Sequence, residues 1–151
     1  MREEVKKRAL SLLDKRDYSR RMLHDKLTEK GATDAEADEV CGWLCELGAV
    51  NDERYAELVV RHYAAKGFGP RRIREELFRR GIEKDLWETA MEELPESDDT
   101  VFRLLCQKLR GTECSREDLQ RAQSFLLRRG YSWEEIRPAM ERYQTNCEDD
   151  L

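Results

Sequence analysis

Residues 66–81 read KGFGPRRIREELFRRG and contain two glycines and a proline within their first five residues. Gly69 occupies a helix-capping position, and Pro70 suits the first position of a helix because the N–H that proline lacks would be unpaired there. Gly81 supplies the left-handed conformation that commonly ends a helix. The stretch therefore predicts one short helix that begins at Pro70 and ends before Gly81.

The same pattern occurs three times along the chain. YSRRMLHDKLTEKG at 18–31 and EDLQRAQSFLLRRG at 117–130 have the same order of apolar, basic and glycine positions. Each helix has an apolar pair four residues apart, and the pairs are Leu23 with Leu27, Ile73 with Leu77, and Ala122 with Leu126. The closing glycines, Gly31, Gly81 and Gly130, are 50 and 49 residues apart. A fixed interval of this size indicates a repeat architecture.

An amphipathic stretch precedes each of these helices and another follows it, so we expect three helices per repeat. No run of alternating β-branched or aromatic residues predicts a strand. The sequence therefore predicts an all-α protein, a tandem array of three three-helix repeats of about 50 residues each, elongated and curved. LGAVND at 47–52 and LPESDD at 94–99 are the predicted linkers, and they divide the chain into repeats at 1–49, 50–96 and 97–151. We expect the acidic C-terminus of the third repeat to fray.

Charge is distributed in blocks. Of the 151 residues, 40% are charged and 39% hydrophobic, and the net charge is -5. Residues 1–30 carry a net charge of +4 and 54–80 carry +5, whereas 31–53 and 82–100 each carry -7. The basic blocks indicate at least one face that meets a negatively charged partner. The alternative is that the helices simply carry uneven solvated faces.

Several functions are not expected from this sequence. Uncharged stretches are far shorter than the roughly 20 residues that span a bilayer, so we expect a cytoplasmic protein without membrane contact. Five cysteines form no repeated framework, and Cys41 and Cys45, four residues apart, are expected to be small core residues rather than metal ligands. Phosphate-binding loops and nucleophile motifs are also lacking. We therefore expect no enzyme activity, no catalytic residues, no metal and no cofactor.

Arginine dominates the candidate binding surface, because five arginines lie within the ten residues 71–80, on sides that a three-helix bundle leaves exposed. The planar guanidinium pairs in bidentate fashion with carboxylates or phosphates. The alternative is that these arginines pair with Glu75 and Glu76 on the same helix. The basic residues expected to bind a partner are Lys66, Arg71, Arg72, Arg74, Arg79 and Arg80 in the second repeat and Arg20, Arg21, Lys26 and Lys30 in the first.

The central repeat resembles a known family. NDERYAELVVRHYAAKGFGPRRIREELFRRGI at 51–82 is similar to the signature region of the RecX family, bacterial regulators of the RecA recombinase. RDYSRRMLHDKLTEKG at 16–31 and FLLRRGYSWEEI at 125–136 resemble the motifs of the family's first and third repeats. The motif positions expected to set the fold are Gly67, Gly69, Pro70, Ile73 and Leu77, with Gly81, Gly31 and Gly130 at the helix ends.

The resemblance implies a regulatory function in recombination and DNA repair. It implies a non-enzymatic protein that binds in the helical groove of the RecA filament on single-stranded DNA. We expect this protein to be a monomer. Such binding usually inhibits filament extension, ATP hydrolysis and strand exchange. Some family members also bind DNA directly, and the alternative function is therefore a stand-alone helical nucleic-acid-binding module that uses the helix at 70–80. The sequence pI near 5.3 disfavours strong direct DNA binding, because the long-range field is repulsive.

Overall fold

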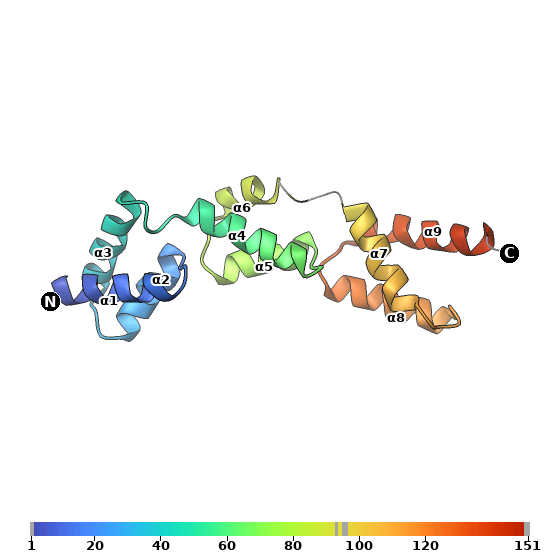
Figure 1. The fold of residues 1–151 in the computed structure, drawn as a ribbon, viewed down its shortest axis with the longest axis horizontal. Helices are drawn as coiled ribbons and strands as arrows, with labels where there is room; N and C mark the ends of the chain where they lie inside the picture. Colours follow the sequence, from blue (N-terminus) through green and yellow to red (C-terminus); the bar gives the residue numbers. More distant parts are fainter. Residues whose placement is uncertain (1, 93, 95–96, 150–151) are drawn as a thin grey trace. The chain divides into compact units, whose positions relative to one another are not determined.

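The computed structural model describes residues 2–92, 94 and 97–149, and within these ranges the chain forms nine α-helices and no strand (Figure 1). The helices are α1 (Arg2–Lys15), α2 (Arg20–Glu29), α3 (Asp34–Glu46), α4 (Asp52–Ala65), α5 (Pro70–Arg79), α6 (Lys84–Met91), α7 (Ser97–Leu109), α8 (Arg116–Arg128) and α9 (Trp133–Asp149). The predicted all-helical class and the three helices per repeat are confirmed.

Local capping chemistry sets the helix ends. The Ser19 side chain accepts a hydrogen bond from the Met22 N–H at 3.2 Å, which satisfies one of the amides that the first turn of α2 leaves unpaired. At α8, Ser115 and Asp118 form a reciprocal capping box. Glycines with positive φ follow the middle helix of each repeat, at Gly31 (108°), Gly81 (78°) and Gly130 (100°).

The chain packs as two compact units. The first unit combines residues 1–59 with 76–90, and the second combines 60–75 with 91–151. The division passes through α4 and α5, so the second repeat contributes to both units. The repeat boundaries drawn from the sequence therefore stay predictions.

The first unit has a core formed by the apolar faces of α1, α2 and α3. The predicted pair Leu23 and Leu27 is completely buried there. Burial of one such side chain stabilises a fold by about 1.5–3 kcal/mol. The core residues are Val5, Ala9, Leu23, Leu27, Ala37, Val40, Cys41, Leu44 and Val50.

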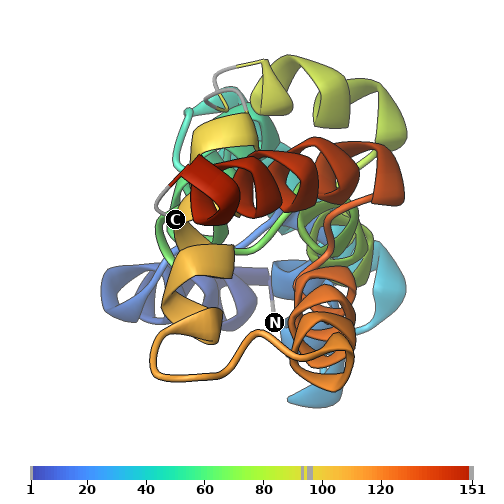
Figure 2. The ribbon, with the colours of Figure 1, turned by 90° about the vertical axis from the view of Figure 1, so that its right-hand side faces the viewer.

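The second unit has its own core, between α7, α8 and α9. These helices, yellow, orange and red in Figure 2, pack against one another. The predicted pair Ala122 and Leu126 is completely buried. The core residues are Val101, Leu105, Leu109, Ala122, Leu126, Tyr131, Ile136 and Ala139.

The C-terminal acidic stretch begins inside a helix, because α9 continues to Asp149. Residues 150 and 151 lie outside the described residues, so the expected fraying stays a prediction. Among the helices that the structure describes, none combines the length and the apolar character needed to cross a membrane.

Candidate partner-binding surface

In the first unit, the N-terminus of α2 packs against the chain that leaves α5. The Ser19 hydroxyl donates a hydrogen bond to the Arg80 carbonyl, 61 residues away in the sequence. Gly81 follows at once and lies against Arg21, since a Cβ at Gly81 would approach the Cβ of Arg21 to 2.6 Å. The helix N-terminus carries partial positive charge and the carbonyl end of a helix carries partial negative charge, so this contact is electrostatically favourable.

The second unit repeats this contact between α5 and α8. The Gly69 N–H donates to the Arg129 carbonyl at 2.7 Å, and the Arg71 N–H donates to the Gly130 carbonyl at 3.0 Å. The approach is close, because a Cβ added at Gly130 would lie 2.5 Å from the backbone nitrogen of Arg72. Gly69 and Gly130 therefore let two backbones meet, which explains why glycine occupies both positions.

The corresponding carbonyl of the first repeat has a different partner. Arg8 of α1 donates to the Lys30 carbonyl at 2.8 Å. The neighbouring Gly31 would have no atom within 4 Å of an added Cβ. The Lys30 carbonyl thus accepts from an arginine side chain. The Arg80 and Arg129 carbonyls instead accept from residues at the N-terminus of a helix.

Ser19→Ala is expected to destabilise the chain by about 2–3 kcal/mol. The substitution removes a helix cap, typically worth about 1 kcal/mol, and leaves the Arg80 carbonyl without its donor. Ser115→Ala is the matched control, because Ser115 caps α8 with the same chemistry on an exposed site and should lose about 1 kcal/mol. Urea unfolding measures both variants, and equal losses would show that the Arg80 contact adds nothing.

The predicted basic residues of the second repeat divide into two groups. Lys66, Arg71 and Arg79 are exposed, as expected. The expectation that all five arginines of 71–80 are exposed is wrong for Arg72, Arg74 and Arg80, which are half-buried. Arg79 keeps 69% of its side-chain surface exposed although it lies 3.6 Å from Glu76.

Internal contacts explain two of the half-buried arginines. The Arg72 guanidinium lies over the rings of Tyr63 and Phe68, at 5.7 and 5.6 Å. Arg80 donates from Nε to Glu76 at 2.9 Å and from its terminal nitrogen to the Tyr55 hydroxyl at 2.6 Å. The alternative of pairing within one helix is therefore correct for Arg80 and Glu76.

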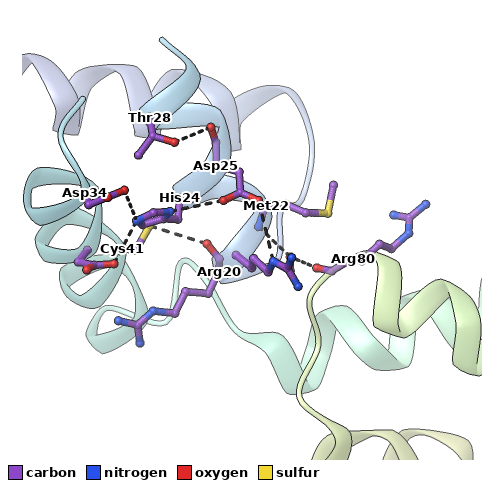
Figure 3. Close-up of polar contacts among 11 residues, drawn as sticks. Arg20, Met22, His24, Asp25, Thr28, Asp34, Cys41 and Arg80 are labelled. Carbon is purple, nitrogen blue, oxygen red and sulfur yellow. Dashed lines mark hydrogen bonds and ion pairs between the residues drawn. The ribbon is translucent and has the colours of Figure 1, made fainter. Parts of the chain in front are cut away.

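The basic residues of the first repeat line α2. Arg20 and Arg21 are exposed at its start, Lys26 is half-buried and Lys30 is exposed after its end. Figure 3 shows Arg20 and Arg80 in the same part of the first unit. The Arg20 N–H donates to the Asp52 carboxylate at 2.9 Å, so its backbone holds α2 to the start of α4 while its side chain stays exposed.

An exposed aromatic residue, not identified from the sequence, lies among the arginines of α5. Phe78 is 67% exposed. It is four residues after Arg74 and seven after Arg71, so the three side chains share one face of the continuous helix. The sequence does contain a signal for this exposure, because Phe78 directly follows Leu77. Adjacent residues of a helix point in different directions, so Phe78 lies off the apolar stripe that contains the buried Leu77. The face defined by Arg71, Arg74, Phe78 and Arg79 is called the α5 face below.

The first unit also contains a polar cluster and a buried thiol. His24 Nε2 lies 3.2 Å from the Asp38 carboxylate and 3.7 Å from the Asp34 carboxylate (Figure 3). These contacts connect α2 to α3. Among the residues that the structure describes, no group of His, Cys, Asp and Glu is arranged to hold a metal ion. Cys41 is completely buried, as predicted for a core residue, whereas Cys45 is half-buried.

Cys41 is expected to resist alkylation at pH 8. Burial raises the pKa of its thiol to about 11, and the thiolate is the reactive form. The folded thiol keeps its proton above pH 9, where an unfolded thiol loses it, so this group destabilises the fold as pH rises from about 9 to 11. Mass spectrometry after iodoacetamide treatment should show Cys114, which is partly exposed, modified well before Cys41. Equal rates would contradict the burial of Cys41.

These observations define a class of protein. The chain is a tandem array of three-helix units with an arginine-rich face that bears an exposed aromatic residue, as in proteins that act by binding another macromolecule. Family profiles described as the first, second and third three-helix domains of RecX match residues 6–44, 51–91 and 96–140. The chain belongs to the RecX family of regulatory proteins, which are not enzymes, and its predicted tandem three-helix organisation is confirmed.

Curated relatives are similar in sequence to this chain along most of their length. Regulatory protein RecX of Vibrio parahaemolyticus is 33% identical over 89% of this chain and 88% of its own length. Regulatory protein RecX of Stenotrophomonas maltophilia is 36% identical over 87% of this chain and 82% of its own length. The crystal structure of RecX from Lactobacillus salivarius has the same fold, with a TM-score of 0.86 and 21% identity over 95% of this chain and 97% of that chain.

Proposed function

We propose that this protein binds the RecA filament on single-stranded DNA along its helical groove and inhibits ATP hydrolysis, filament extension and strand exchange. Membership of the RecX family is the observation that carries the proposal, because all three domains match and the curated relatives are regulatory proteins.

The α5 face is the proposed contact. Arg71 and Arg79 present guanidinium groups to solvent, and such groups pair with carboxylates of an acidic protein surface or with phosphates. Phe78 adds an exposed apolar side chain to the same helix. Aromatic residues and arginine are enriched among the residues that carry most of the binding energy at protein interfaces. This combination therefore favours a protein partner over bare DNA.

Arg20 and Arg21 extend the proposed contact in the first unit. They lie at the start of α2, and Arg21 lies against Gly81, directly after Arg79 and Arg80. The cations of two successive domains are thus brought together by the contact between α2 and the end of α5. We propose that Arg72 and Arg80 act indirectly, by holding the helix ends that position this surface.

The net charge of -5 does not prevent such recognition. At physiological ionic strength the Debye length is about 8 Å, so distant acidic blocks are screened once the surfaces meet. The acidic blocks would instead slow the encounter with DNA or with an acidic protein. Recognition of RecA would therefore depend on short-range contacts and not on electrostatic steering.

A titration of RecA ATPase activity tests the direction of regulation. RecA from the same organism hydrolyses ATP on single-stranded DNA while increasing amounts of this protein are added. We expect ATP hydrolysis to be inhibited at less than one molecule of this protein per RecA protomer. Unchanged or increased hydrolysis at saturating protein would overturn the inhibitory function.

A further inference from the structure

A backbone contact of one kind occurs once in each compact unit. In the first unit the Arg80 carbonyl, just after α5, accepts a hydrogen bond from Ser19 at the N-terminus of α2. In the second unit the Arg129 carbonyl, just after α8, accepts one from the Gly69 N–H at the N-terminus of α5, 2.7 Å away. Each contact lies within a single unit. The end of α5 and the end of α8 are therefore equivalent places in two successive domains.

The turn that ends each of these two helices is also the same. The Gly81 N–H donates to the Phe78 carbonyl at 3.0 Å, and the Gly130 N–H donates to the Leu127 carbonyl at 3.0 Å. Both glycines have positive φ. The interval of 49 residues between the glycines also separates Phe78 from Leu127, and an arginine follows each of these two residues. The two turns can therefore be compared residue by residue.

Each turn carries an exposed apolar side chain that the core does not use. Phe78 is 67% exposed and Leu127 is 41% exposed, although each directly follows a completely buried leucine. A single exposed apolar residue on a protein surface is ordinary. Here the same position is apolar and exposed in two domains, and an exposed arginine, Arg79 or Arg128, follows it in both. Such a pair buries apolar surface and forms charge-assisted hydrogen bonds when a protein partner covers it.

A second exposed arginine is added at each turn by the neighbouring helix. At the end of α5 it is Arg21, whose side chain lies against Gly81. At the end of α8 it is Arg71, whose N–H donates to the Gly130 carbonyl at 3.0 Å. Each set of three exposed side chains lies within one unit. We call them the α5-end site, with Arg21, Phe78 and Arg79, and the α8-end site, with Arg71, Leu127 and Arg128.

The end of α2 lacks this combination. The interval of 50 residues between the first two repeats places Thr28 and Glu29 where the α5-end site has its apolar residue and its arginine. The carbonyl that follows, that of Lys30, accepts from the Arg8 side chain and not from a helix N-terminus. The apolar residue and the arginine are therefore present at the two helix ends that receive a neighbouring helix, and they are absent at the end that does not.

The chemistry of the two sites selects a protein surface that has carboxylates beside an apolar patch. Guanidinium groups pair with carboxylates, and Phe78 and Leu127 gain free energy where a partner removes them from water. A phosphate backbone offers negative charge without an apolar patch. Two equivalent sites on one chain fit a partner that presents the same patch more than once, as a filament of identical protomers does.

We propose that the α5-end site and the α8-end site bind the same acidic and apolar patch on two different protomers of the RecA filament, so that one chain is bivalent. This inference rests on the proposed function. Once one site is bound, the second binds at a high effective concentration, so the affinity for a filament exceeds the affinity of either site alone. A few exposed side chains at each site are then sufficient for tight binding.

Filaments of different length test the two sites. RecA is assembled with a slowly hydrolysed ATP analogue on oligothymidylates of increasing length. Fluorescence anisotropy gives the affinity of the labelled full chain at equal concentrations of RecA protomers. Wild-type affinity should rise at least about tenfold once a filament holds enough protomers for both sites. Leu127→Ala/Arg128→Gln and Phe78→Ala/Arg79→Gln should each show no such rise, and each should bind long filaments at least about tenfold more weakly than wild type.

Leu47→Ala/Lys84→Gln is the matched control, because it removes an exposed apolar side chain and an exposed cation that belong to neither site. The control should bind as wild type does. All substituted residues are exposed, so every variant should keep the helicity of wild type, which circular dichroism checks.

Bivalent binding is overturned if Leu127→Ala/Arg128→Gln keeps the affinity and the length dependence of wild type, or if the control loses affinity equally. An equal loss on the oligothymidylates without RecA would assign the α8-end site to DNA and would also overturn it. Wild type that binds no filament of any length would instead overturn the proposed function.

Discussion

Gly130→Ala is expected to open the contact between α5 and α8 and to destabilise the second unit by about 2–5 kcal/mol. The φ of +100° at this position is unfavourable for any residue with a Cβ, at about 1–2 kcal/mol. The added Cβ would also meet the Arg72 backbone nitrogen at 2.5 Å, and such overpacking typically costs about 1–3 kcal/mol. A backbone atom cannot move aside as a flexible side chain can, so the two helix ends must separate.

Amide hydrogen exchange measures this opening directly. The N–H groups of Gly69 and Arg71 donate to the carbonyls of Arg129 and Gly130, so both should lose protection in Gly130→Ala. Gly31→Ala is the matched control. Gly31 has a similar φ of +108° but no atom within 4 Å of an added Cβ, so only the conformational cost should remain. Protection at Gly69 and Arg71 that survives in Gly130→Ala would contradict the close approach.

The double variant Arg71→Glu/Phe78→Ala is expected to raise the concentration needed for RecA inhibition about 30-fold or more. Loss of one interface residue that dominates binding costs about 2 kcal/mol or more, which corresponds to this factor. Both side chains are exposed, so helicity and stability should remain those of wild type. The measurement is the ATPase titration, with circular dichroism as the check on folding.

Lys84→Glu/Leu47→Ala controls for this variant. It makes the same change in charge and removes an apolar side chain that is 62% exposed, close to the 67% of Phe78, but neither residue lies on α5. The control should inhibit RecA as wild type does. Equal inhibition by all three proteins would remove the α5 face from the contact. Arg72, which lies over the rings of Tyr63 and Phe68, and Arg80, which donates to Glu76 and Tyr55, are poor targets for this test because their substitution would disturb the fold.

The ends of the helices can be predicted from the sequence, because the residues that cause a helix to begin or end are close to that end in the chain. Ser19 and Ser115 cap helices within their own first turns, and Gly31, Gly81 and Gly130 follow the helices they end. Each of these features depends on a few neighbouring residues and on φ, which residue identity constrains strongly. The 50-residue interval then gave the number of repeats.

The sequence was insufficient where a side chain depends on distant partners. The bond from Ser19 to the Arg80 carbonyl joins residues 61 apart, and nothing local to either residue indicates it. For the same reason Arg72 and Arg80 could not be separated from Arg71 and Arg79, because all four belong to one basic cluster. Only the folded structure shows that Arg72 lies over Tyr63 and Phe68. It likewise shows that Arg80 donates to Glu76 and Tyr55.

A binding titration tests directly whether the protein binds RecA filaments in preference to DNA. Fluorescently labelled protein is titrated with poly(dT) alone and with filaments of RecA assembled on poly(dT) with a slowly hydrolysed ATP analogue, at about 0.2 M salt, where phosphate contacts are weakened. We expect binding to filaments to be at least tenfold tighter than binding to poly(dT), and Arg71→Glu/Phe78→Ala to reduce it. Equal affinity for filaments and poly(dT), or no binding to filaments, would contradict the proposed function.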